Sequence, residues 1–197
     1  MSDARRHSPA AERNAPFILA ALQQRLPAQG RLLEVASGTG QHAAALSVGL
    51  PGWHWQPSDR EPEAFASIAA WCVGLPQVAA PIQLDVLVPP PLPGPFDAVY
   101  CANMVHIAPW ACTAGLMRLA ARVLDPKGLL ITYGPYLEDE APTAPSNLAF
   151  DADLRARHPD WGLRHIRSVR EVARSEGLDL QERVAMPANN LLLVWGR

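Results

Sequence analysis

Residues 32–42 read Leu-Leu-Glu-Val-Ala-Ser-Gly-Thr-Gly-Gln-His, an apolar run that ends in two glycines one residue apart. The run Leu32–Ala36 is typical of a strand buried on both faces. Gly38 and Gly40 then allow a sharp turn, and the alanine-rich residues 43–50 predict a helix. A strand, a glycine turn and a helix N-terminus together form a cradle in which the backbone closely approaches a ligand. The stretch therefore predicts a ligand-binding turn.

The glycines alone leave two interpretations of this turn. Gly38-x-Gly40-x-x-Ala43 fits the fingerprint of folds that bind a nicotinamide dinucleotide (NAD). It also fits a plain strand-to-helix turn in some other α/β protein. The rest of the chain is needed to separate the two.

Length and composition indicate a single globular domain over residues 1–197. Hydrophobic residues make up 49% of the chain and charged residues 18%, which suits a domain with a full core. The formal net charge is −2, and Lys127 is the single lysine. Sequence-independent binding to nucleic acid needs a basic surface that displaces counterions, so we expect no nucleic-acid partner.

The three cysteines, Cys72, Cys101 and Cys112, are odd in number and have no Cys-x-x-Cys spacing. They predict neither a disulfide framework nor a metal site, and we expect a reducing, cytoplasmic compartment. No apolar run reaches membrane-spanning length, and residues 1–16 lack the apolar core of a signal peptide. We therefore expect no membrane association. The sequence leaves the oligomeric state open.

Strand and helix patterns alternate along the chain. Strands are predicted, besides the first, at residues 53–56, 78–84, 95–101, 129–133, 178–184 and 191–195. Helices are predicted at residues 9–26, 43–50, 62–72, 110–124, 150–158 and 168–176. Five strand–helix units followed by an antiparallel pair of strands predict an α/β fold with a mostly parallel sheet.

Carboxylates follow two of the predicted strands. Asp59 comes about twenty residues after the glycine turn, where an acid can accept hydrogen bonds from both hydroxyls of a ribose. Its alternative role is to cap the helix that Pro62 opens. Asp85 directly follows the third strand, at the rim of the crevice where such sheets bind ligands. Its alternative role is that of a turn aspartate before the proline-rich loop 89–95.

Glu34, inside the first strand, distinguishes the candidate cofactors. With it, residues 34–40 resemble the first motif of class I S-adenosylmethionine (SAM)-dependent methyltransferases, in which the acid orders the glycine loop and faces the methionine end. The strand Phe96-Asp97-Ala98-Val99, followed by a polar loop and a helix, is similar to a later part of the same pattern. A dinucleotide dehydrogenase normally continues with a parallel sixth strand, whereas this chain predicts an antiparallel pair.

Nearly the whole chain, from Ser8 to Val194, resembles an uncharacterised methyltransferase-like family of bacteria and animals. The matching motifs are S-P-A-A-E-R-N (8–14), E-V-A-S-G-T-G-Q-H (34–42), Q-P-S-D (56–59), A-N-M-V-H-I (102–107), G-P-Y (134–136) and M-P-A-N-N-L-L-L-V (186–194). The resemblance implies a Rossmann-like fold with a seven-stranded sheet of order 3-2-1-4-5-7-6 and an antiparallel C-terminal strand. It also implies SAM as the cofactor.

The cofactor site implied by the resemblance combines the glycine turn, the strand ends and a polar pair in the first helix. Its residues are Arg13, Asn14, Glu34, Ser37, Gly38, Thr39, Gly40, His42, Asp59, Arg60, Asp85, Val86 and Asn103. An acid at the position of Asp85 commonly accepts a hydrogen bond from the adenine amino group in this fold. The alternative for Arg13 and Asn14 is capping at the protein surface.

Three residues are candidates for catalysis: His106, Asn103 and Tyr133. In methyl transfer from SAM the protein mainly aligns the reactants and removes a proton when the acceptor carries one. His106 is the nearby side chain whose ordinary pKa suits a base at neutral pH. Alternatively, His106 packs against or caps a helix, and Tyr133 belongs to the core.

The acceptor is expected to be a small molecule enclosed by residues 133–161 together with Asn189 and Asn190, and the loop and helices of residues 134–176 form the substrate side. Its candidate contacts are Tyr136, Asn147 and the pair Asn189 and Asn190, for which turn formation is the alternative. The sequence thus favours a small-molecule methyltransferase. A SAM-binding module without catalysis and an NAD-dependent enzyme remain as alternatives.

Overall fold

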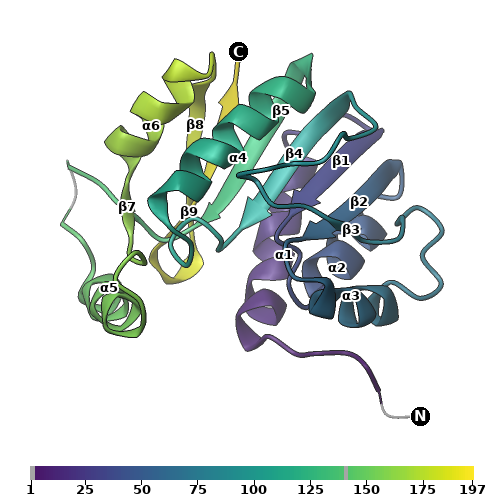
Figure 1. Ribbon diagram of the computed structural model, residues 1–197, viewed down its shortest axis with the longest axis horizontal. Coiled ribbons are helices and arrows are strands. Elements are labelled where there is room, and N and C mark those ends of the chain that lie inside the picture. The colour runs from purple at the N-terminus through teal and green to yellow at the C-terminus, as the bar shows by residue number, and fades with distance from the viewer. Residues whose placement is uncertain (1–2, 140–141) are drawn as a thin grey trace.

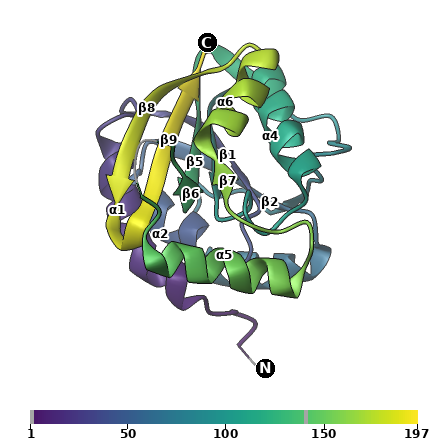
Figure 2. The ribbon, with the colours of Figure 1, turned by 90° about the vertical axis from the view of Figure 1, so that its left-hand side faces the viewer.

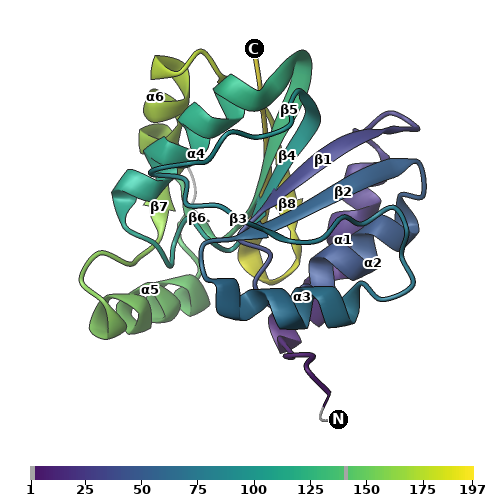
Figure 3. The ribbon, with the colours of Figure 1, turned by 45° about the vertical axis from the view of Figure 1, so that its right-hand side comes forward.

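The computed structural model describes residues 3–139 and 142–197. A seven-stranded sheet forms its middle layer and helices cover both faces (Figure 1, Figure 3). Residues 140 and 141, within the predicted loop 134–147, lie outside the described residues, as do residues 1 and 2.

The main sheet has the predicted strand order. In spatial order its strands are β3 (Ile82–Gln83), β2 (Trp53–Asp59), β1 (Gly30–Val35), β4 (Phe96–Ala102), β5 (Leu124–Gly134), β9 (Asn190–Gly196) and β8 (Asp179–Met186). β9 runs antiparallel to β5 and β8, and the other neighbours are parallel. Counted along the chain within this sheet, the order is 3-2-1-4-5-7-6, which confirms the predicted fold class.

Helices cover the two faces of the sheet unequally. One face carries α1 (Pro9–Gln23), α2 (Gln41–Gly49) and α3 (Phe65–Trp71), and the other carries α4 (Trp110–Val123) and α6 (Ile166–Ser175) (Figure 3). α5 (Pro145–Arg157) lies apart from both layers, across the edge where the parallel strands end (Figure 2). Two short strands, β6 (Tyr136–Leu137) and β7 (Arg164–His165), pair with each other. In the sequence β6 precedes α5 and β7 follows it. The single turns of 3-10 helix are η1 (Pro62–Ala64) and η2 (Pro187–Asn189).

β1 is buried on both faces because successive side chains of a strand point to opposite sides. Leu33 and Val35 pack in the core cluster formed with α4 and α6. Leu32 packs in the second cluster, formed with α1 and α2. The run of apolar residues in β1 therefore serves two cores at once, as expected for a central parallel strand.

Several predicted elements differ in their bounds from the structure. The strand predicted at 129–133 begins at Leu124, and the helix predicted at 62–72 is η1 followed by α3. The third strand, predicted over 78–84, is reduced to Ile82–Gln83 and an isolated bridge between Val78 and Trp55. Pro81 lies between the two and has no N–H to continue the ladder of hydrogen bonds. The helix predicted from residue 150 already begins at Pro145, because proline is well suited to the first position of a helix. Asn147 consequently lies on α5 and not in a loop.

Gly40 offers a test of how the turn packs. Its φ is +88°, and a Cβ added there would lie 2.5 Å from the Cα of Ile68 in α3. Gly74 has a similar φ of +79°, with nothing within 4 Å of an added Cβ. We expect Gly74→Ala to lower the free energy of unfolding by about 1–2 kcal/mol, the cost of a left-handed conformation. Gly40→Ala should cost clearly more, because backbone must also move, and urea unfolding of both variants measures the difference. Equal losses would contradict this account.

Candidate cofactor and active site

The glycine turn joins the end of β1 to the start of α2. Ala36, Gly38 and Gly40 all have positive φ, at 58°, 56° and 88°. The Gly40 N–H donates to the carbonyl oxygen of Ser37 at 2.9 Å, which closes the turn. A Cβ added at Gly38 would meet no atom within 4 Å, so the turn faces open space at this residue.

Asp59, the last residue of β2, is bonded to the turn. Its Oδ2 accepts a hydrogen bond from the Gly38 N–H at 2.9 Å, and its Oδ1 accepts one from the Glu61 N–H at 3.0 Å. The second bond closes a local turn. The N-cap of the helix that Pro62 opens is Glu61, without a side-chain hydrogen bond, so the predicted capping by Asp59 is wrong, and the contact that Asp59 makes is with the glycine turn. Each carboxylate oxygen has two acceptor positions, so both oxygens keep the capacity to accept from a ligand.

Glu34 lies beneath the turn and is buried, with 2% of its surface exposed. Its Oε2 accepts a hydrogen bond from the indole Nε1 of Trp55 at 2.9 Å. Burial raises the pKa of the Glu34 carboxyl from 4.5 to about 7, against the opposing effect of the hydrogen bonds from Trp55 and Ser37. The side chain connects β1 to β2 and to the turn, as expected for an acid that orders the loop.

A cleft of about 560 Å³ opens at the ends of the parallel strands. Its wall on the β1–β3 side includes Val35, Ala36, Gly38, Asp59, Arg60, Glu61, Leu84, Asp85 and Val86. Its opposite wall includes Ala102, Met104, Ile107, Ala108, Pro109, Cys112, His158 and Trp161. This volume is typical of a cofactor or small-molecule site. The cleft lies beside β1. From β1 the chain adds β2 and β3 on one side and then β4 and β5 on the other, and such a change of direction is the usual ligand position in these sheets.

Asp85 and Arg60 form local contacts at the rim of this cleft. The Oδ1 of Asp85 accepts from the Leu87 N–H at 2.9 Å, which is the predicted turn contact. Arg60 forms an exposed ion pair of 2.6 Å with Glu61. Both side chains nevertheless line the cleft, so the turn role and a position at the ligand site coexist.

Some predicted cofactor residues do not line the cleft. Arg13 is exposed and Asn14 half-buried on α1, and neither belongs to the lining. His42 is buried in α2, with its Nδ1 3.4 Å from the Tyr100 hydroxyl, and its Nε2 makes no hydrogen bond to another described residue. Burial lowers the pKa of His42 to about 4, so the imidazole is neutral at pH 7. Thr39 donates from its hydroxyl to the side-chain oxygen of Gln41 at 3.1 Å.

The three catalytic candidates meet at the ends of β4 and β5. The Asn103 N–H donates to the carbonyl oxygen of Tyr133 at 2.8 Å, and Asn103 has a φ of +60°. A Cβ added at Gly134 would lie 3.2 Å from His106 Nδ1 and 3.7 Å from Asn103 Oδ1. Gly134 thus leaves room for both side chains.

His106 and Tyr133 are both buried. His106 is 5% exposed and its ring packs edge-on against Phe150 of α5, with centroids 5.5 Å apart. Burial, and then the charge of Arg164, lower the pKa of His106 to about 4. Burial raises the pKa of Tyr133 to about 12. At neutral pH the imidazole and the phenol are therefore both uncharged.

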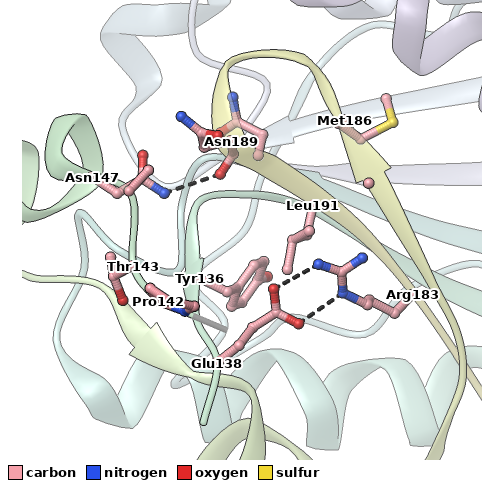
Figure 4. A pocket seen from close by; sticks show the side chains of 12 residues that line it. Tyr136, Glu138, Pro142, Thr143, Asn147, Arg183, Met186, Asn189 and Leu191 are labelled. Carbon is pink, nitrogen blue, oxygen red and sulfur yellow. Dashed lines mark hydrogen bonds and ion pairs between the residues drawn. The ribbon is translucent and has the colours of Figure 1, made fainter. Parts of the chain in front are cut away.

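The four predicted acceptor residues line a second, smaller cavity of about 240 Å³ (Figure 4). Tyr136 contributes to it from β6, Asn147 from α5, Asn189 from η2 and Asn190 from the start of β9. The Asn147 Nδ2 donates to the carbonyl oxygen of Asn189 at 3.0 Å. The structure therefore brings together residues separated by more than 50 positions in the chain.

An ion pair lines the same cavity. The Arg183 guanidinium donates from Nε and Nη2 to the two carboxylate oxygens of Glu138 at 2.7 and 2.6 Å (Figure 4). Tyr136 points its hydroxyl toward the core, where it donates to Thr132 Oγ1 at 2.9 Å. The lining thus combines an ion pair and amide groups with the ring of Tyr136 and aliphatic side chains.

The catalytic candidates lie between the two cavities. Ala102, at the cleft, pairs with Tyr133, and Gly134 pairs with Leu191, which lines the smaller cavity. Two strand spacings separate β4 from β9, about 10 Å. Two ligands, one bound in each cavity, would therefore come close to each other at the ends of β4 and β5.

Sequence reasoning missed His158 and Trp161, which line the cleft from the segment after α5. No motif or periodicity marks them in the sequence.

Among residues 3–139 and 142–197, no helix combines the length and apolar character needed to cross a membrane. The same residues contain no group of three or more His, Cys, Asp or Glu side chains placed to hold a metal ion.

A family model described as "Protein of unknown function (DUF938)" matches residues 5–197. The chain belongs to this family. The match covers almost the whole chain, in agreement with the predicted resemblance.

Solved structures show the same fold. CalO1, a methyltransferase in calicheamicin biosynthesis in its SAH-bound form, matches with a TM-score of 0.77 and 17% identity over 95% of this chain and 54% of its own. Human N-acetylserotonin methyltransferase in complex with SAM matches with a TM-score of 0.79 and 15% identity over 93% and 51%. An O-methyltransferase family 2 protein from Planctomyces limnophilus DSM 3776, in complex with apigenin, matches with a TM-score of 0.74 and 22% identity over 93% and 61%.

This family member therefore has the fold of SAM-dependent methyltransferases. It spans 51 to 61% of the length of these three chains, which is a little over half. At such identities the likeness establishes the fold alone.

Glu34 predicts an unusual dependence of stability on pH. Its pKa is raised in the folded protein from 4.5 to about 7, so the folded state keeps the proton to higher pH than the unfolded state. The contribution of Glu34 to stability is therefore complete below pH 4.5 and is lost as the pH rises through 7, by roughly 3 kcal/mol. Glu34→Gln does not titrate and keeps an acceptor for Trp55. We expect urea unfolding to show the variant gaining stability relative to the wild type between pH 4.5 and 8, and parallel pH profiles would contradict this.

Proposed function

We propose that the protein is a SAM-dependent methyltransferase that acts on a small molecule. The observation that carries the proposal is the cleft at the ends of the parallel strands, where Gly38 faces open space and Asp59 and Asp85 stand on the same wall. A glycine turn at a helix N-terminus together with acids on neighbouring strand ends suits an adenosyl group joined to an amino acid. The methyltransferase fold supports the same assignment.

The residues present fit this cofactor. Asp59 is assigned to the ribose hydroxyls, since its oxygens keep free acceptor positions. Asp85 and Val86 are assigned to the adenine, and the turn from Ser37 to Gly40 to the methionyl part. Glu34 supports that turn from below through Trp55 and Ser37. We keep Arg13, Asn14, Thr39, His42, Arg60 and Asn103 as proposed contacts.

When bound, the cofactor supplies a methyl group on a positively charged sulfur. The chain's own task is then to align the acceptor and to remove its proton where it carries one. His106 is assigned as the base, because its imidazole lies at the ends of β4 and β5 and is neutral at pH 7, although burial lowers its pKa to about 4 and makes it a weaker base than an ordinary histidine. Asn103 and Tyr133 are assigned to orient the acceptor as neutral hydrogen-bonding groups.

The acceptor is assigned to the smaller cavity and the ends of β4 and β5. A volume of about 240 Å³ suits a compact molecule, and the amides of Asn147, Asn189 and Asn190 suit hydrogen-bonding groups on it. The net charge of −2 offers nucleic acid no electrostatic attraction. We also place the protein in the cytoplasm, where Cys72, Cys101 and Cys112 would persist as free thiols.

A SAM-binding module without catalysis is the second candidate. The observation that favours it is the burial of His106 and Tyr133, neither of which lines either cavity. Turnover of labelled SAM with a pool of metabolites separates the two candidates. Transfer of the label to an acceptor supports the enzyme, and binding without transfer supports the module.

Asp59 tests the cofactor assignment. We expect SAM and S-adenosylhomocysteine (SAH) to bind and NAD to bind much more weakly in calorimetry. Asp59→Ala should weaken SAM binding by roughly 1.5–3 kcal/mol, the value of hydrogen bonds to a charged group. Asp153→Ala is the matched control, because Asp153 is exposed on α5 and pairs only with Arg157 among the described residues. Unchanged SAM affinity in a folded Asp59→Ala variant would remove the ribose assignment.

His106 tests the catalytic assignment. We expect His106→Ala to lower turnover by roughly 10²-fold or more while SAM affinity changes only a fewfold, because the base acts in the chemical step. The pKa of about 4 further predicts no inflection from His106 in the turnover profile between pH 6 and 8. Initial rates and calorimetry provide both measurements. Equal losses of binding and turnover would instead make His106 a structural part of the site.

A further inference from the structure

The cofactor cleft is bounded on its outer side by residues 158–164, which we call the outer segment. It runs from the end of α5 to the first residue of β7 and contributes His158 and Trp161 to the cleft lining. These two rings face the same space as Asp59, Asp85 and Val86, more than 70 residues earlier in the chain. Neither ring lines the smaller cavity.

Backbone hydrogen bonds hold the outer segment in place. The Gly162 N–H donates to the carbonyl oxygen of His106 at 3.0 Å, which attaches the segment to the loop after β4. The Leu163 N–H donates to Asp151 Oδ1 at 2.6 Å, which attaches it to α5. Gly162 and Leu163 are both buried. The segment is thus joined to the loop that forms the inner part of the same wall.

Arg164 strengthens this connection. Its guanidinium donates to the carbonyl oxygens of Val105 at 3.1 Å, Ala108 at 2.7 Å and Asp160 at 2.6 Å. It also stacks on Trp110, 5.7 Å from the ring centroid. Within the described part of the chain Arg164 forms no ion pair of 4 Å or less, so it bonds here to backbone alone. A planar guanidinium with several fixed donors suits such a bridge, and a lysine could not reproduce it.

The Trp161 ring is held before any ligand arrives. It stacks on His158 with centroids 5.4 Å apart and an interplanar angle of 25°. The Arg157 guanidinium lies 5.5 Å from the ring centroid. An aromatic ring already fixed by its neighbours loses little conformational entropy when a flat ligand packs against it.

We propose that Trp161 packs against the adenosyl group of the cofactor and that Arg164 is the positioning residue that holds Trp161 there. This inference rests on the proposed function, because it takes the residues across the cleft as the ribose and adenine contacts. An indole gives a purine a large apolar surface, and stacking of a base on an aromatic side chain is a substantial and general source of affinity. The outer segment is then part of the cofactor site and not of the acceptor site.

Calorimetry with SAH and with adenosine tests the contact. Trp161→Ala should weaken SAH binding about tenfold or more and weaken adenosine binding by a similar factor, whereas Trp161→Phe should stay within about threefold of wild type for both. SAH should also quench the tryptophan fluorescence of the wild type, and this quenching should largely disappear in Trp161→Phe. Should Trp161→Ala fail to fold, the fluorescence comparison decides. Wild-type quenching that persists in Trp161→Phe overturns the contact.

Arg164 is tested by a double-mutant cycle. Arg164→Gln should weaken SAH binding, and the double variant with Trp161→Ala should bind SAH within about threefold of Trp161→Ala alone, because Arg164 acts through Trp161. Arg170→Gln is the matched control, since Arg170 pairs with Asp179 away from the cleft. Additive losses would overturn the positioning role.

The outcomes also separate this inference from the proposed function. A wild type that binds SAH, together with a folded Trp161→Ala variant of equal affinity, overturns the inference and leaves the cofactor assignment intact. A wild type that does not bind SAH overturns both.

Discussion

The hydrogen bond from the Gly38 N–H to Asp59 Oδ2 connects the glycine turn to the neighbouring strand, and the shape of the cleft depends on it. A second bond, from the Ser37 N–H to the carbonyl oxygen of Ser58, runs beside it. Together they hold a turn in which Gly38 and Gly40 adopt positive φ at little cost, whereas Ala36, with its Cβ, adopts it at a higher cost. Because the turn is fixed, the N-terminus of α2 has a fixed position relative to the ends of β1 and β2.

The buried carboxyl of Glu34 supports this turn at a cost. Its Oε2 accepts from the Trp55 indole, and with a pKa of about 7 the group is still about half protonated at pH 7, since burial disfavours the charged form. A hydrogen-bonded neutral acid joins strand and turn without leaving an unpaired charge in the core. Burial of this carboxyl therefore lowers the free energy of unfolding near neutral pH, while its hydrogen bonds keep the turn fixed. Such a loss of stability is common at functional sites.

The sheet topology explains why two cavities share one edge. β1 lies between β2 and β4, so the crossover helices leave in opposite directions and open a crevice at the strand ends. β9 runs in the reverse direction, and this returns residues 187–190 to the same edge beside α5. The loops that carry Asn103 and His106 then stand between the crevice and the smaller cavity. The proposed methyl transfer requires two ligands to meet end to end, and this layout is compatible with that requirement.

The strand, the glycine turn and the helix could be predicted from the sequence, because each depends on short-range features, whereas the strand order followed from the resemblance to a known family. Apolar runs, glycines at fixed spacing and a proline at a helix start act within a few residues. Asp85 could likewise be placed at the cleft, because it directly follows a strand that ends there, whereas Val86 was implied only by the resemblance. The buried Glu34 was predicted near the turn for the same reason, although its raised pKa was not.

Only the tertiary structure decided which side chains face the cleft from distant elements. Trp161 and His158 reach it through hydrogen bonds of Gly162 and Arg164 to a loop more than 50 residues earlier, and no local pattern encodes such a contact. His106 was placed near the site by its motif, but its burial against Phe150 depends on where α5 packs. Side-chain direction and burial arise from packing between elements, whereas periodicity records only the face that an element presents.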